Sequence, residues 1–439
     1  MPTIVTRQDT STAEGPRVSG FTGPVRTARQ VRTFAVHATE WKRPFLERYF
    51  PDRCFHFLPK AITGRDIERI WGPRILAEQS ELFVWGLELP PALAALATAG
   101  NIPVWFIEDG FVRSARPSAS RTPPLSLALD GRTAYFDCRK RSDLEVLLST
   151  YNFEMDQQLM ARARAGIELL LEGGISKYNG GHQKTAEEVY GAKTGKRVLV
   201  VGQVEDDASI RYGCLVPMTN NDLVRLAAAE QEGSQILYRP HPDVLSGVRP
   251  AKSDPSEVAH LCEIVTERLP IAEALRTVDH VYTITSLAGF EALLRGIRVT
   301  TAGCPFYSGW GLTDDRQPNP RRGRPLGIEA LFAGAYLLYP RYFDPETGAR
   351  TSFEATVANI RRQLEEPEGV SRSRPAWRAW GPYGILGWRH LLTAAVTPII
   401  RRMGNDRDVE DFRADPIRFF RSLSDRRFRI IGRILYPFG

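Results

Sequence analysis

Two consecutive carboxylates, Glu108 and Asp109, follow an apolar strand predicted for residues 104–107. The carboxyl ends of parallel strands face the ligand crevice of an open α/β sheet, so both side chains could reach a bound sugar. A carboxylate at the anomeric carbon of a sugar stabilises oxocarbenium charge or attacks that carbon directly. The structural alternative is that Asp109 caps the following turn while Glu108 pairs with Arg113.

One histidine, His241, lies between two prolines just after a strand predicted for residues 236–238. The prolines restrict the backbone on both sides of the imidazole. An imidazole fixed in this way could donate a hydrogen bond or a proton to a leaving phosphate. A histidine whose hydrogen bonds are satisfied within its own loop is the structural alternative.

A strand that runs into a helix near residue 285 indicates a second phosphate contact. Thr285 or Ser286 would be the N-cap residue, where free backbone amides and the helix dipole attract an anion. Glu291 follows about a turn and a half later, within reach of a nucleotide ribose. Simple helix capping would produce the same pattern whatever the function.

A polar loop, residues 202–213, follows another predicted strand, and its Arg211 could pair with a carboxylate or phosphate. Its three adjacent acids could suggest a metal site. Sequential carboxylates on a loop are more often solvated, however, so we predict no metal. The sequence has no signature of serine hydrolases, zincins, P-loop proteins or dinucleotide-binding proteins, which leaves phosphate and sugar chemistry.

The elements that must position these side chains are short apolar strands alternating with helices, which indicates parallel βαβ units. We expect an α/β fold in which two Rossmann-like domains face a cleft, as in GT-B enzymes, with a helical C-terminal extension. The predicted division of the chain is a disordered leader over 1–29, an N-terminal Rossmann-like domain over 30–190, a second Rossmann-like domain over 191–350, a cross-over helix over 351–369 and a basic, Trp- and Arg-rich helical tail over 370–439.

Composition adds limits on the compartment and on the partners. The five cysteines are scattered and never form a C-x-x-C pair, which favours a reducing, cytoplasmic compartment. No apolar run approaches the roughly 20 residues that span a bilayer. Residues 413–433 contain seven arginines and two aspartates interleaved with Phe, Ile and Leu. Such a helix could lie on an anionic membrane surface or dock on its own domain.

The net charge of +7 could also indicate nucleic acid, but no aromatic-and-basic recognition motif is present, so we predict no nucleic-acid partner.

The same segments, in the same order, resemble the bacterial capsule polysaccharide β-Kdo transferases, the KpsC and KpsS group. Kdo is the eight-carbon acid 3-deoxy-D-manno-octulosonic acid. The resemblance covers roughly residues 80–365. It includes E-D-G-F-V-R-S from residue 108, S-K-Y-N from 176, D-A-S-I-R-Y-G from 207, R-P-H-P-D-V from 239 and T-S-L-A-G-F-E-A-L-L from 285.

The resemblance implies CMP-Kdo as the donor, retention of β configuration and an aspartate nucleophile that forms a covalent sugar adduct. Asp109 is the candidate nucleophile, Glu108 is the alternative, and His241 is expected to stabilise the leaving CMP. The expected donor-binding residues are Arg113, Lys177, Asp207, Ser209, Arg211, Arg239, Thr285, Ser286 and Glu291. Among these, Arg113, Lys177 or Arg211 could hold the carboxylate of the sugar.

We expect no cofactor, and the expected partners are the CMP-sugar donor and a lipid-linked glycan acceptor at the inner face of the inner membrane. Fuller members of the group carry two tandem modules, whereas this chain has one, and its segment 203–206 differs from the usual family pattern. Two other functions fit the sequence: a non-catalytic polysaccharide export or assembly protein, and a transferase that uses another activated sugar.

Overall fold

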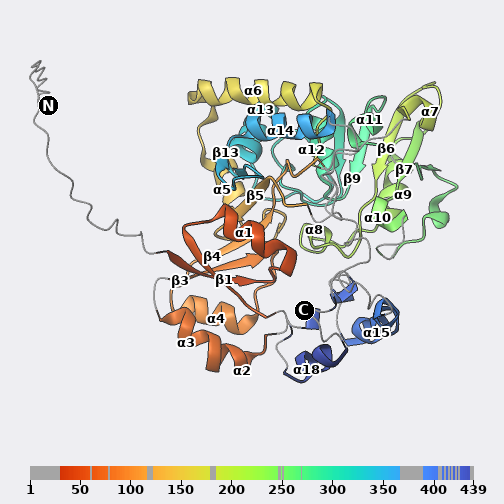
Figure 1. Ribbon diagram of the computed structural model, residues 1–439. Helices are drawn as coiled ribbons and strands as arrows, with labels where there is room; N and C mark the ends of the chain where they lie inside the picture. The colour runs from red at the N-terminus through yellow and green to blue at the C-terminus, as the bar shows by residue number, and fades with distance from the viewer. Residues whose placement is uncertain are drawn as a thin grey trace, which may run out of the picture.

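Two parallel-stranded sheets form the framework of the protein (Figure 1). The computed structural model describes residues 30–59, 62–77, 80–115, 122–177, 184–245, 252–267, 269–365, 389–403 and 426–435, together with Arg249 and part of 408–423. The leader predicted over 1–29 lies outside these residues.

The first sheet has seven strands in the order β13-β12-β5-β4-β3-β1-β2. Its parallel part consists of β1 (Val31–Val36), β2 (Arg53–Phe57), β3 (Ser80–Trp85) and β4 (Val104–Asp109). The antiparallel part consists of β5 (Ser126–Asp130), β12 (Arg341–Phe343) and β13 (Arg350–Thr351). Every residue of β3 is buried, as expected for an apolar strand covered on both faces.

Helices that pack around the first sheet are α1 (Arg43–Tyr49), α2 (Gly64–Asp66), η2 (Ile67–Trp71), α3 (Gly72–Leu76), α4 (Pro91–Ala99) and α5 (Asp143–Thr150). The long helix α6 (Gln157–Glu172) follows, with Asp156 as its N-cap residue. It leads to the segment that enters the second domain.

The second sheet has six parallel strands in the order β11-β10-β9-β6-β7-β8. They are β6 (Arg197–Val201), β7 (Gln235–Arg239), β8 (Glu263–Ile264), β9 (His280–Thr283), β10 (Arg298–Thr301) and β11 (Asp314–Asp315). The helices between or beside them are α7 (Ala186–Tyr190), α8 (Ala208–Arg211), α9 (Asn220–Glu230), α10 (Pro242–Leu245), α11 (Ile271–Ala274) and α12 (Leu287–Leu293).

The chain returns to the first domain earlier than the sequence predicted. Strand β12 pairs antiparallel with β5, with Arg341 opposite Leu127, so the prediction that the second domain extends to residue 350 is wrong for this strand. The error has a physical cause: β12 is three residues long, and its partner lies about 200 residues earlier, so no local pattern identifies it.

Helices α13 (Ile328–Phe332) and α14 (Phe353–Glu365) pack against α6 and hold the two domains together. Gly166 of α6 permits this contact, because a Cβ there would lie 2.8 Å from the ring of Phe332 and 3.1 Å from that of Phe353. Helix α14 occupies residues 353–365 of the cross-over helix predicted over 351–369, whose first residue, Thr351, lies instead in β13.

The described C-terminal residues form helices α15 (Arg389–Met403) and α18 (Arg426–Leu435). They share a small apolar core of Ile400, Val409, Phe412, Phe419 and Phe420, and Figure 1 shows them as a group apart from both sheets. The predicted α/β fold of two Rossmann-like domains with a helical extension is confirmed. Of the helices within the described ranges, none combines the length and apolarity needed to cross a membrane.

Candidate functional site

Glu108 lies at the carboxyl end of β4, beside the end of β3. A Cβ on Gly86, the residue after β3, would stand 3.7 Å from its Oε1. Burial raises the pKa of Glu108 to about 7, and the neighbouring Asp109 carboxylate acts in the same direction. The ammonium groups of Lys42 and Lys177 lower this pKa. The protein therefore holds Glu108 near the midpoint of its titration at neutral pH.

Asp109 and Arg113 form a partly buried ion pair, with Arg113 Nε 2.6 Å from Asp109 Oδ2. The Arg113 side chain is fully buried and also donates to Ser114 Oγ and the carbonyl of Thr122. Arg113 is therefore engaged inside the first domain rather than turned toward a sugar carboxylate. The second oxygen of Asp109, Oδ1, is buried and has no hydrogen-bond partner in the described parts of the chain.

Gly110 lets the chain turn directly after the two carboxylates. A Cβ at this position would lie 2.2 Å from Ser126 Oγ on the adjacent strand β5. Any other residue would push β4 and β5 apart, so glycine at 110 fixes the place at which Asp109 leaves the sheet.

The second domain presents Asp207 to the same region. Its carboxylate caps α8 by accepting a hydrogen bond from the backbone N–H of Ser209 at 2.8 Å. The negative charge of Asp207 raises the pKa of Glu108 in the first domain and also that of His241 in the second. Asp207 therefore lies within electrostatic range of a residue in each domain, Glu108 and His241.

His241 has a defined orientation at the end of β7. Its Nδ1 accepts a hydrogen bond from the backbone N–H of Asp243 at 3.1 Å, so the neutral ring carries its hydrogen on Nε2. Burial lowers the pKa of His241, although the nearby Asp243 and Asp207 carboxylates oppose this effect. At neutral pH the residue is a neutral imidazole that can donate from Nε2.

Glu291 on α12 is joined to the segment between the domains. The backbone N–H of Lys177 donates to its Oε1 at 3.2 Å. Burial raises the pKa of Glu291 to about 7, and this hydrogen bond, together with Arg295, Lys177 and Arg239, opposes the rise. The Lys177 ammonium therefore acts on carboxylates of both domains, Glu108 and Glu291.

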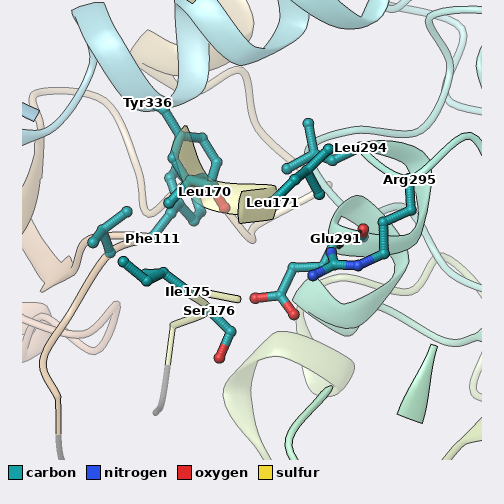
Figure 2. Close-up of a pocket in the computed structure, with 10 residues that line it drawn as sticks. Phe111, Leu170, Leu171, Ile175, Ser176, Glu291, Leu294, Arg295 and Tyr336 are labelled. Carbon is teal, nitrogen blue, oxygen red and sulfur yellow. Dashed lines mark hydrogen bonds between the residues drawn. The ribbon is translucent and has the colours of Figure 1, made fainter. Parts of the chain in front are cut away.

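A small pocket lies beside Glu291 (Figure 2). Phe111 and Tyr336 close one side of it, while Ser176 and Arg295 supply polar groups. In Figure 2 the Glu291 carboxylate points toward Ile175 and Ser176, which lie in the segment after α6. The pocket thus combines residues of both domains.

Ser286 is the N-cap residue of α12, as predicted, and its Oγ accepts from the backbone N–H of Ala288 at 3.2 Å. Thr285 instead exchanges two hydrogen bonds with the side chain of Gln203, at 3.0 and 2.8 Å. Gln203 thus anchors the loop after β6 to the loop before α12.

The other predicted donor-binding residues are placed as follows. Arg239 is close enough to Glu291 to affect its pKa and donates to the carbonyl of Leu269. Arg211 is exposed, and its guanidinium lies 3.6 Å from Glu88 of the first domain. Pairwise electrostatic effects therefore link Glu108, Lys177, Asp207, His241, Arg239 and Glu291, while Arg113 lies within the first domain and Arg211 pairs with Glu88.

Two residues near the site were not predicted. Lys42 lies with its Nζ 3.7 Å from the ring centroid of Trp85 and lowers the pKa of Glu108. Nothing in the sequence marks it, because it neither ends a strand nor belongs to a motif. Gln203 could have been found, since it directly follows a strand that the sequence does identify.

No group of three His, Cys, Asp or Glu residues within the described ranges is arranged to hold a metal ion.

The chain has clear relatives. A family model described as "Capsule polysaccharide biosynthesis protein" matches residues 81–342. The lipopolysaccharide-processing protein LpsZ of Rhizobium meliloti is 42% identical over 348 residues, which is 78% of each chain. The capsule polysaccharide modification protein LipA of Neisseria meningitidis serogroup B is 39% identical over 333 residues. This alignment covers 75% of the present chain but only 45% of LipA.

Two solved structures have the same fold. They are the β-Kdo 2,4 transferase and the β-Kdo 2,7 transferase of Thermosulfurimonas dismutans KpsC, each 30% identical in sequence to this chain. The alignment with the 2,4 transferase has a TM-score of 0.62 and covers 75% of this chain and 98% of the transferase chain. The alignment with the 2,7 transferase has a TM-score of 0.59 and covers 76% of this chain and 100% of the transferase chain. With a family match over more than half of its length, this chain belongs to the capsule polysaccharide biosynthesis protein family.

Proposed function

We propose that this chain is a retaining β-Kdo glycosyltransferase, which transfers Kdo from CMP-Kdo to a lipid-linked acceptor during synthesis of a capsular or other surface polysaccharide. The observation that supports the proposal is that Asp207 of the second domain raises the pKa of both Glu108 and His241, while Lys177 lowers that of Glu108. The similarity to the two KpsC transferase structures supports Kdo as the sugar.

Asp109 is the proposed nucleophile. Arg113 holds one carboxylate oxygen at 2.6 Å, while the other oxygen has no partner among the described residues. In the first step this oxygen forms a bond to the anomeric carbon of Kdo, and the bond between that carbon and the phosphate oxygen of CMP breaks. This step inverts the configuration at the anomeric carbon and leaves a glycosyl ester on Asp109.

His241 and Lys177 assist this step in different ways. The Nε2–H of His241 donates a hydrogen bond to the departing phosphate of CMP, whose charge grows as the bond breaks. The Lys177 ammonium, which lies near both Glu108 and Glu291, offsets the negative charge of the Kdo carboxylate beside these acids. Glu291 binds the ribose of CMP.

Glu108 is the proposed base of the second step. With a pKa of about 7, it is partly ionised at neutral pH and can accept the proton of the acceptor hydroxyl. The hydroxyl oxygen then bonds to the anomeric carbon while the ester bond to Asp109 breaks. This second inversion at the anomeric carbon restores the β configuration. Asp109 thus acts as nucleophile and its neighbour Glu108 as base, because their environments differ.

The test is intact mass spectrometry of the purified protein with CMP-Kdo and a synthetic glycolipid acceptor. The wild type should gain the mass of one Kdo, and Asp109→Asn should not. Glu108→Gln should accumulate the adduct, because its formation needs no base while its transfer does. An adduct that persists in Asp109→Asn and is lost in Glu108→Gln would reverse the two roles.

A donor panel tests the sugar. CMP release from CMP-Kdo, with little or none from CMP-sialic acid or UDP-sugars, is the expected result. Release from another donor with none from CMP-Kdo would contradict the proposal.

A further inference from the structure

The C-terminal stretch of the chain carries most of the net positive charge of the protein. Residues 389–439 contain eleven arginines and six acidic residues, so this stretch accounts for five of the seven net positive charges of the chain. Arg401 and Arg402 at the end of α15 are exposed, as are Arg413 and Arg427. This charge lies beyond the segment that matches the family model, which ends at residue 342.

Large apolar side chains are exposed among these arginines. Ile399 on α15 is 54% exposed, and Ile430 and Ile431 on α18 are 47% and 43% exposed. Burying such side chains is worth about 25 cal/mol for each Å² removed from water. Exposed isoleucines next to exposed arginines therefore form a surface that is apolar and cationic at the same time.

The isoleucines are exposed because α18 uses another face for its own core. Gly432 faces Phe420, since a Cβ on Gly432 would lie 2.1 Å from Phe420 Cβ, and Leu435 packs on the same apolar cluster. Ile430 is displaced from Gly432 by about 200° around the helix, given about 3.6 residues per turn. The helix thus has one face on the C-terminal core and presents Ile430 on the opposite side.

A second basic and apolar surface belongs to the first domain. Ile70 and Leu76 are each 51% exposed, and Arg69 and Arg74 beside them are exposed as well. They lie on η2 and α3. In the view of Figure 1 this region and helices α15 and α18 lie at the same, lower end of the molecule.

We propose that α15 and α18 dock this protein on a bilayer that contains anionic lipid. The arginines would contact lipid phosphates, and the exposed isoleucines would enter the boundary between headgroups and acyl chains, as in other interfacial helices. A nucleic acid would satisfy the arginines but would leave the isoleucines in water, so charge and apolarity together favour lipid. The inference does not depend on which sugar the protein transfers.

The test is sedimentation of the full chain with vesicles. Phosphatidylcholine vesicles that contain phosphatidylglycerol should bind the protein, pure phosphatidylcholine vesicles should bind it far less, and added salt should release it. Replacing Arg401 and Arg402 by Gln should lower the partition coefficient about 30-fold, since each arginine at an anionic surface contributes about 1 kcal/mol. The exposed pair Arg361 and Arg362 on α14, changed in the same way, is the matched control.

The apolar contribution has its own pair of variants. Ile430→Ser with Ile431→Ser should weaken binding to anionic vesicles, whereas Leu215→Ser with Val216→Ser, an exposed apolar pair in the second domain, should not. Circular dichroism of each variant checks that it is folded. Equal binding to neutral and anionic vesicles, or equal losses in test and control pairs, would overturn the proposal. So would binding of an anionic oligonucleotide without any binding to vesicles.

Discussion

The backbone N–H of Lys177 donates to Oε1 of Glu291 at 3.2 Å, while the ammonium group of the same lysine lowers the pKa of Glu108. One residue between α6 and α7 thus acts on a carboxylate from each domain. The segment that connects the domains therefore contributes a positive charge to the site that they form together.

The first prediction concerns the pH dependence of transfer. If Glu108 accepts the acceptor proton, it must be ionised, so kcat/KM for the acceptor should rise with pH through about 7, the pKa of Glu108. Lys177→Met removes a cation that lowers this pKa, so the rise should move to higher pH. A pH series of transfer rates measures the shift.

Lys140→Met, at an exposed position of the first domain, is the control for the Lys177 variant and should leave the profile in place. A profile that stays unchanged in Lys177→Met, with only the donor KM raised, would mean that Lys177 binds the sugar without tuning Glu108.

The second prediction concerns His241. Its Nδ1 is occupied by the Asp243 N–H, so only Nε2 is left to donate to CMP. His241→Ala should slow CMP release by about 100-fold, the lower end of the range for general acid assistance. His241→Gln should recover much of the rate, because the glutamine amide nitrogen can occupy the place of Nε2. Single-turnover release of CMP provides the measurement, and the exposed His260→Ala is the control.

Much of the fold could be predicted from the sequence, because the parallel strands are continuous apolar runs. The segment 197–201 is buried at every position. Strands β4 and β7 contain the predicted strands 104–107 and 236–238, but β4 continues through Glu108 and Asp109. Strand β12 could not be predicted, because three residues are too few to show the alternation of side chains that is typical of a strand. Its pairing with β5, where Arg341 lies opposite Leu127, is a contact between distant parts of the sequence.

Part of the candidate site could be predicted, because functional side chains of α/β proteins occur at the carboxyl ends of parallel strands. Glu108 lies at the carboxyl end of the parallel strand β4, and Asp207 and His241 lie in the segments after β6 and β7, where a sheet places its ligand-binding side chains. The partner of Arg113 was not predictable in the same way. Its charge suggested a ligand contact, yet the side chain is fully buried against Asp109. Lys42, which lies over the ring of Trp85 and lowers the pKa of Glu108, belongs to no sequence motif.

The third prediction concerns the ion pair between Glu145 on α5 and Arg322 in the loop after β11. Arg322 Nε lies 3.0 Å from Glu145 Oε2, and each side chain is only 3% exposed. Glu145→Gln should cost about 3–5 kcal/mol in the free energy of unfolding, because it leaves a buried guanidinium without its counter-charge. Urea denaturation measures the change.

The exposed pair Arg162 and Glu354 is the comparison, with side chains 43% and 41% exposed. Glu354→Gln should cost about 0–1 kcal/mol, because water already screens this pair. Similar costs for the two substitutions would show that the contact between the domains does not depend on the buried charge.

The last prediction concerns stability and pH in the absence of donor. Burial raises the pKa of Glu291 from its ordinary value of 4.5 to about 7 in the folded protein. Between these values the folded state binds more protons than the unfolded state, so the free energy of unfolding falls as pH rises from about 4.5 to about 7. Glu291→Gln removes this contribution and should flatten the dependence of the free energy of unfolding on pH over that window, by on the order of 1–3 kcal/mol.

Urea midpoints measured across this pH window give the change, with Glu329→Gln on helix α13 as the control. If the slope is the same with and without the Glu291 carboxyl, that group is already ionised at acidic pH, and its hydrogen bond from Lys177 outweighs the cost of burial.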